Sequence, residues 1–194
     1  RPEALILISL AIGSYGVARI LQATPHGLGL IGDSFFYVTG AENLAEGRGF
    51  GRLRGGGEFA PTTHYPPGYS LAMASFQVLG VDKLESARWV NLGSYVVLIL
   101  SVAGLLRRAT GSNAAGLLAC LFLGFSPVLL GVHAWVMSEA LYLGLNAVAL
   151  FLVIVAGEVL PKALALGNAR LLSPPAAAMI RFLQVLLSPV IRLL

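Results

Sequence analysis

Charged residues are scarce in this sequence. They make up 11% of the 194 residues, whereas 57% are hydrophobic and the mean hydropathy is +0.81. An ordinary soluble domain has about 25% charged residues, and a soluble fold of this composition would leave much apolar surface uncovered. The bilayer is therefore the expected solvent. The apolar runs are long and do not alternate, which predicts an all-α protein rather than a membrane barrel.

Cysteine is almost absent, and basic residues do not cluster. Cys120 is the one cysteine, so neither an intrachain disulfide framework nor a cysteine-based metal site can form. The net charge of +4 is scattered along the chain. Without a basic stripe there is no nucleic-acid footprint.

Four apolar runs predict spanning helices in a polytopic, multi-pass protein of the cell membrane. Each is roughly as long as the 20 residues that cross a bilayer core, and Gly13 and Gly16 are positions where another helix can approach closely. The predicted helices cover residues 4–23, 87–106, 114–130 and 136–156. A long polar first loop, residues 24–86, contains a helix at 33–45, a flexible glycine-rich loop at 47–61 and a short interfacial helix at 68–79.

The arginine pair Arg107 and Arg108 indicates the orientation. It lies in a short loop without acidic residues, which the positive-inside tendency places in the cytoplasm. The first loop is then expected to be extracytoplasmic, and the connection around residues 133–139 returns to the same side.

Asp33 and Glu139 are more than a hundred residues apart, but this topology puts both at the same membrane depth. Acidic groups near hydrocarbon are candidates for function by default. The pair could hold a divalent metal such as Mg²⁺ or Mn²⁺, or act as base and charge stabiliser. Two structural alternatives stay open: Asp33 as the cap of a helix that begins at Ser34, and Glu139 as an interfacial acid at a helix start.

Five segments together resemble the GT-C superfamily of membrane glycosyltransferases, in particular the bacterial relatives of protein O-mannosyltransferases and the aminoarabinose transferase of lipid A. The resemblance covers about residues 4–152. The segments are GDSFFY (32–37), AENLAEGRGF (41–50), HYPPGYS (64–70), SARWVNL (86–92) and SPVLLGVHAWVMSEALY (126–142). The resemblance implies inverting transfer of a sugar from a polyprenyl-phosphate carrier to a lipid, glycan or protein acceptor at the outer face.

The same resemblance implies roles for individual residues. Asp33 corresponds to the first-loop acid, the general base, and Glu139 to a second acid that supports the site or a metal. The implied substrate-binding residues are Tyr37, Arg48, His64 and Tyr65, with Arg52 and Arg54 as alternative phosphate partners. Membrane-interface anchoring is the competing interpretation for Tyr37. Members of the superfamily continue with further membrane helices beyond this length.

The tail, residues 153–194, resembles a different family, the membrane domain of CNNM and CorC-type magnesium transport proteins. Gly157, Glu158, Pro161, Lys162 and Asn168 carry this resemblance. It implies an alternative function in cation transport, with a seam between two families near residues 150–156. Glu158 and Lys162 could also form a simple ion pair at i and i+4, with Pro161 disturbing the helix between them. A third alternative is a non-catalytic membrane fragment or fusion.

Overall fold

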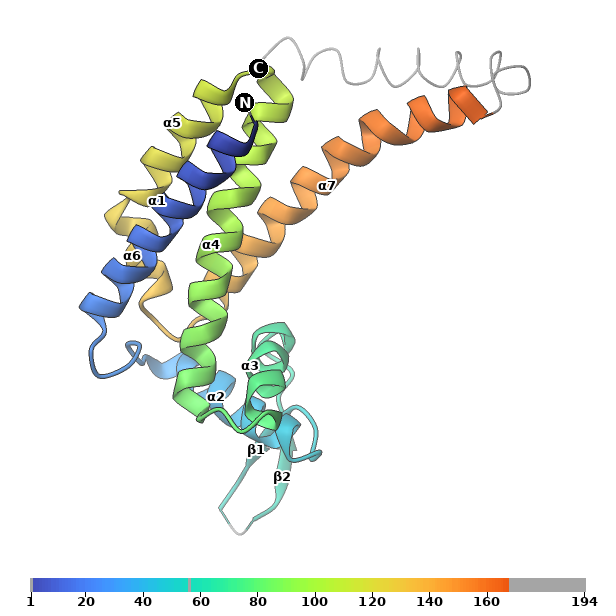
Figure 1. The fold of residues 1–194 in the computed structure, drawn as a ribbon. Coiled ribbons are helices and arrows are strands. Elements are labelled where there is room, and N and C mark those ends of the chain that lie inside the picture. The colour runs from blue at the N-terminus through green and yellow to red at the C-terminus, as the bar shows by residue number, and fades with distance from the viewer. Residues whose placement is uncertain (1, 56, 168–194) are drawn as a thin grey trace. The chain divides into compact units, whose positions relative to one another are not determined.

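The computed structural model describes residues 2–55 and 57–167, and these residues form seven helices and one two-stranded hairpin (Figure 1). The contacts divide the chain into a first unit, residues 1–151, and a second unit that begins at Leu152. The elements are α1 (Pro2–Ala23), α2 (Gly32–Ala45), β1 (Gly51–Leu53), β2 (Phe59–Pro61), α3 (Gly68–Val78), α4 (Lys83–Thr110), α5 (Asn113–Gly124), α6 (Pro127–His133) and α7 (Ser138–Gly167).

Within the described residues, three helices are long and apolar enough to cross a membrane. The candidate spans are Glu3–Ala23, Lys83–Thr110 and Ser138–Glu158. The helices α5 and α6 make a fourth span if they are counted as one, although they bend by 64° at their junction. The prediction of a multi-pass helical protein with about four spans is thus confirmed as three or four.

The bend corrects the prediction of one continuous helix over residues 114–130. Pro127 occupies the first turn of α6, where its missing N–H group is no loss, and it cannot continue the hydrogen-bond ladder of α5. The Ser126 hydroxyl accepts a hydrogen bond from the Leu129 N–H at 3.3 Å and so caps the new helix.

Glycines set the close approach of α1 to its neighbours in the first unit. A Cβ atom at Gly13 would lie 3.8 Å from Val96 on α4, and one at Gly16 would overlap the ring of Tyr95. Helices in a bilayer associate through such close packing because lipid tails supply no hydrophobic drive between them. The prediction that another helix approaches Gly13 and Gly16 is confirmed.

The hairpin between α2 and α3 corrects both the flexible-loop prediction and the strictly all-α class. Arg52 pairs with Ala60 and Leu53 with Phe59 in antiparallel register. The Arg54 N–H donates to the Glu58 carbonyl at 2.8 Å, and Gly57 has a positive φ of 85° that suits glycine. Gly57 therefore helps the chain to turn between the two strands.

Two long helices differ from their predicted bounds. The helix α4 begins at Lys83 instead of residue 87 because Oδ1 of Asp82 accepts hydrogen bonds from the N–H groups of Leu84 and Glu85. The helix α7 runs to Gly167 instead of residue 156. It continues through Pro161 and through the proposed seam, whereas residues 168–194 of the predicted tail lie outside the described part.

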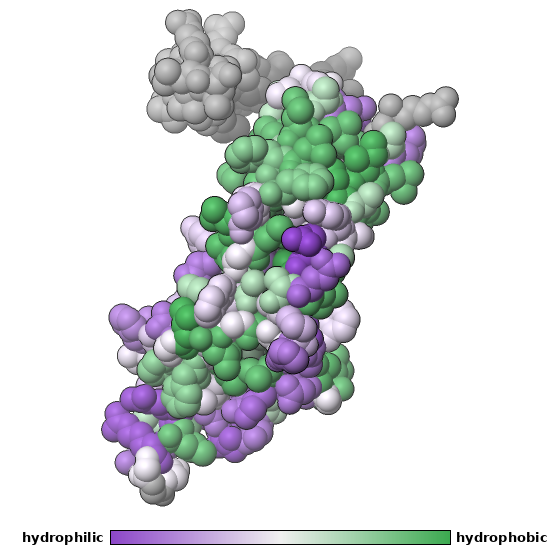
Figure 2. Space-filling view, turned by 90° about the vertical axis from the view of Figure 1, so that its left-hand side faces the viewer, coloured by the Kyte–Doolittle hydropathy of each residue, from purple (hydrophilic) through white to green (hydrophobic). Residues whose placement is uncertain are grey.

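Polar and apolar surfaces separate along the first unit. The elements α2, α3 and the hairpin lie at the end of α4 where that helix begins (Figure 1). On the face drawn in Figure 2, hydrophilic residues gather towards the end that carries the hairpin. The polar first loop is thus an organised layer at one end of the helices.

Candidate functional site

Two connections, one before α2 and one before α7, are joined by backbone hydrogen bonds. The Gly29 N–H donates to the Ala134 carbonyl at 2.8 Å, and the Val136 N–H donates to the Gly29 carbonyl at 2.9 Å. A Cβ atom at Gly29 would lie 2.6 Å from the ring of Trp135, so this approach requires glycine. We call this pairing of residues 29 and 134–136 the connection bridge.

Side chains extend the connection bridge to the two predicted acids. The Ser34 hydroxyl donates to the Val136 carbonyl at 2.8 Å, and the hydroxyls of Tyr37 and Ser138 are 2.9 Å apart. Asp33 immediately precedes Ser34, and Glu139 immediately follows Ser138. The bridge therefore brings the segments that carry both acids to the same end of the helices.

Asp33 does not cap α2. The helix begins at Gly32, two residues earlier than the capping hypothesis requires, and the hydroxyl that accepts a bond from the Ile31 N–H belongs to Ser34. The exposed Asp33 carboxylate accepts instead a hydrogen bond from the Tyr65 hydroxyl at 2.7 Å. Its place in the first helical turn is electrostatically favourable for a negative charge.

An aromatic cluster surrounds this hydrogen bond. The Tyr65 ring stacks on Phe36, with centroids 4.7 Å apart, and meets Tyr37 edge-on at 5.5 Å. His64 lies edge-on to Tyr65 at 5.1 Å. The structure thus brings together three of the predicted substrate-binding residues, Tyr37, His64 and Tyr65, of which Tyr65 contacts Asp33.

Burial and hydrogen bonding raise the pKa values of Tyr65 and Tyr69, which lie outside the spanning helices. The hydrogen bond to Asp33, followed by the loss of surrounding water, raises the pKa of Tyr65 above its usual range. Burial raises the pKa of Tyr69. Both phenols are therefore neutral hydrogen-bond donors at physiological pH.

The cation of this cluster is Arg52. Its guanidinium carbon lies 5.3 Å from the centroid of Phe36, a cation–π contact. Arg48, the predicted phosphate partner, is placed elsewhere: its Nε donates to Asn43 at 2.7 Å and it forms an ion pair with Glu46. That is at the far end of α2, roughly 20 Å from Asp33 at 1.5 Å per helical residue.

Asn91 and Tyr69 are contributors that the sequence reasoning missed. Asn91 is fully buried, and its amide donates to the carbonyls of His133 at 3.1 Å and Trp135 at 2.7 Å. Its carbonyl accepts from the Tyr69 hydroxyl at 2.8 Å. It thereby ties α4 to the connection bridge and to α3. An amide near the start of the predicted spanning helix 87–106, in SARWVNL, was the available signal.

The predicted metal site has few protein ligands. Among the described residues no group of three or more His, Cys, Asp or Glu side chains could hold a metal ion. Asp33 and Glu139 are two exposed carboxylates. Mg²⁺ is commonly bound by one or two carboxylates together with substrate phosphates. Carboxylates are thus the ligand type that such an ion would take, and the metal itself stays a prediction.

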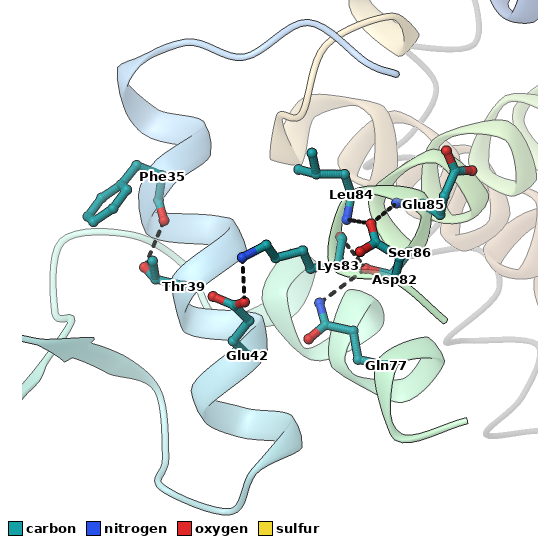
Figure 3. Close-up of polar contacts among 9 residues, drawn as sticks. All are labelled: Phe35, Thr39, Glu42, Gln77, Asp82, Lys83, Leu84, Glu85 and Ser86. Carbon is teal, nitrogen blue, oxygen red and sulfur yellow. Dashed lines mark hydrogen bonds and ion pairs between the residues drawn. The ribbon is translucent and has the colours of Figure 1, made fainter. Parts of the chain in front are cut away.

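A second polar contact joins α2 to α4 away from Asp33. The Lys83 ammonium donates to Glu42 at 2.9 Å (Figure 3). An open pocket of about 580 Å³ adjoins this pair and is lined also by Glu46, Gln77 and Asp82. The pocket contains none of the predicted site residues, and the ion pair is partly exposed, so we assign it a structural role.

Comparison with protein-family models, curated proteins and solved structures finds no match to this chain.

Proposed function

We propose that this chain carries the acceptor-activating part of a membrane glycosyltransferase, which moves a sugar from a polyprenyl-phosphate carrier to an acceptor hydroxyl at the extracytoplasmic face. One observation carries the proposal: an exposed carboxylate, Asp33, is held by Tyr65 beside an aromatic stack that also holds the Arg52 cation. A base and a phosphate-binding cation are the two groups that this reaction needs.

In the proposed reaction, Asp33 takes the proton of the acceptor hydroxyl as its oxygen attacks the anomeric carbon. The new carbon–oxygen bond forms as the bond from that carbon to the carrier phosphate breaks, and the bonding electrons leave with the phosphate. Arg52 stabilises the negative charge that develops there. Attack opposite to the leaving group inverts the anomeric centre.

Glu139 and the remaining rings have supporting roles in this proposal. Glu139 begins α7 beside the Tyr37–Ser138 contact, where it can stabilise positive charge on the sugar or share a Mg²⁺ or Mn²⁺ ion with the carrier phosphate. Tyr37 and His64 border the space next to Tyr65. The proposed extracytoplasmic placement of the site rests on Arg107 and Arg108, which the positive-inside tendency places in the cytoplasm. They lie in the last turn of α4, at the opposite end from the hairpin.

The magnesium-transport alternative rests on the sequence of the tail. Its residues Glu158 and Lys162 both fall on α7, but the Lys162 side chain and residues 168–194 lie outside the described part. Reversing the charge with Glu158→Lys and following magnesium flux in vesicles tests it. Loss of flux would favour transport over sugar transfer.

The decisive test is transfer of radiolabelled sugar from a pool of polyprenyl-phosphate sugars by the chain in lipid nanodiscs, with and without Mg²⁺ or Mn²⁺. We expect Asp33→Asn to lower transfer about 100-fold or more, because a general base contributes on that order. Glu58→Gln is the matched control, since Glu58 is an exposed acid in the same layer. Both variants should keep the wild-type elution volume and thermal unfolding.

Two outcomes would count against the proposal. Undiminished transfer by Asp33→Asn would remove this residue from the mechanism. No transfer by a well-folded wild-type chain would show that these residues alone do not make an active enzyme, and would favour the fragment or transport alternatives.

A further inference from the structure

Tyr65 is fixed more firmly than a residue of an exposed segment needs to be. Its ring stacks on Phe36 with an interplanar angle of 25°, and it makes T-shaped contacts with the rings of Tyr37 and His64. Pro66 follows Tyr65, and a residue that precedes proline is restricted to extended backbone conformations. The phenol therefore points its hydroxyl in a defined direction.

The Asp33 side chain, by contrast, is exposed and has one hydrogen-bond partner among the described residues. Its Oδ1 accepts from Tyr65, and its Oδ2 is left for another donor. An exposed carboxylate without such a partner samples several rotamers, and a base must hold one geometry within about 0.5 Å to act efficiently.

Resting on the proposed function, we infer that Tyr65 is a positioning residue for Asp33 rather than a ligand of the sugar donor: its hydroxyl occupies Oδ1 and so directs Oδ2 towards the acceptor hydroxyl. Asp33 remains the group that takes the proton. Tyr65 contributes through the orientation of that carboxylate, and the aromatic cluster contributes by holding Tyr65.

The first test examines the contact itself and needs no turnover. Fluorotyrosine placed at position 65 and followed by ¹⁹F NMR at constant neutral pH reports the surroundings of the phenol. Because this phenol donates to the Asp33 carboxylate, Asp33→Asn should change the chemical shift of the fluorine, whereas Glu58→Gln should leave it as it is. An unchanged chemical shift in Asp33→Asn would overturn the inference.

The second test separates positioning from binding. Tyr65→Phe keeps the stacked ring and removes only the hydroxyl, so we expect kcat to fall about 10-fold or more while KM for the sugar donor stays the same. A higher KM with unchanged kcat would overturn the inference and make Tyr65 a ligand of the sugar donor. The control is Tyr142→Phe, because Tyr142 is an exposed tyrosine on α7, and it should leave both constants unchanged.

The two tests distinguish the inference from the proposed function. If the wild-type chain transfers no sugar, the proposed function fails, and the positioning role fails with it even where the fluorine chemical shift shows the contact. If the wild type is active, Asp33→Asn is inactive and Tyr65→Phe equals wild type, the function stands and the inference is overturned.

Discussion

The helical bundle and the polar layer at its end are held together in different ways. Where α1 meets α4 and α5, glycines permit close contact: Gly16 lies against Tyr95, and Gly124 lies against Ile12. Hydrogen bonds between side chains of these helices are sparse, the Ser9–Cys120 contact at 3.3 Å being an example. In the polar layer, hydroxyls and rings make the contacts between elements.

The difference follows from the two solvents. In hydrocarbon, helices associate through close van der Waals packing of their backbones, and small residues make that packing possible. Water competes for hydrogen bonds, so the polar layer orders its elements with bonds that are shielded by rings, such as the one between Tyr37 and Ser138. Asn91 joins the two regions, because it is a buried amide on a spanning helix whose partners belong to the polar end.

Replacing Asn91 should disrupt the link between the helical bundle and the polar layer, and we expect it to have the largest effect on stability. Asn91→Leu leaves the carbonyls of His133 and Trp135 and the hydroxyl of Tyr69 without their partner. We expect the free energy of unfolding to fall by about 3 kcal/mol, measured by denaturant titration in detergent micelles. Asn146→Leu is the control, since Asn146 is exposed and donates to a carbonyl of its own helix. Equal effects of the two variants would contradict the joining role.

Adding one methyl group at a helix crossing tests the bundle side. In Gly16→Ala the new Cβ overlaps the Tyr95 ring, and we expect a loss of about 2 kcal/mol of unfolding free energy by the same titration. Gly93→Ala is matched to it, because a Cβ at Gly93 meets no atom within 4 Å. That variant should be neutral or gain up to about 1 kcal/mol from helix propensity. A stable Gly16→Ala would show that α1 and α4 do not approach so closely.

Removing one hydroxyl tests the polar side. Tyr37→Phe keeps the rings in contact but loses the bond to Ser138. The expected cost is about 1 kcal/mol, and backbone amide exchange around residues 134–138 should accelerate. Unchanged exchange there would mean that the backbone bonds of the connection bridge suffice without this side-chain pair.

The smallest effect is expected at the ion pair between α2 and α4. Lys83→Gln removes an interaction between partly exposed groups, and such pairs contribute at most about 1 kcal/mol. We expect a change of about 0.5 kcal/mol or less, reduced further by added salt. A larger loss would show that Lys83 orders the polar layer.

Hydropathy and helix signals in the sequence located most of the helices but not the hairpin. Apolar runs located the spanning helices to within a few residues at most ends, and the helical spacing after Asp33 located α2. Asp82 followed by Glu85 is a start signal for α4, but the polar stretch around it was interpreted as a break. Pro127 was interpreted as lying near the end of one helix, whereas it begins a second helix, α6.

The site could be predicted only in part, because its contacts join distant segments. The spacing indicated that Asp33, His64 and Tyr65 share a loop, but not that Tyr65 bonds Asp33. The sequence does not distinguish Arg48 from Arg52, because both are arginines of the same loop. The hairpin register is what brings Arg52 to Phe36. A run of glycines predicts flexibility unless a tight turn is recognised.

The connection bridge also has a consequence for the order of synthesis. Tyr37 and its partner Ser138 are 101 residues apart in the chain. The backbone partners of Gly29 are likewise translated much later, at residues 134–136. While the chain is being made, α2 and the hairpin therefore emerge well before the groups that fix them exist. The acid at residue 33 acquires its final surroundings only after the start of α7 has been translated, so a nascent chain that stops short of it lacks an assembled centre.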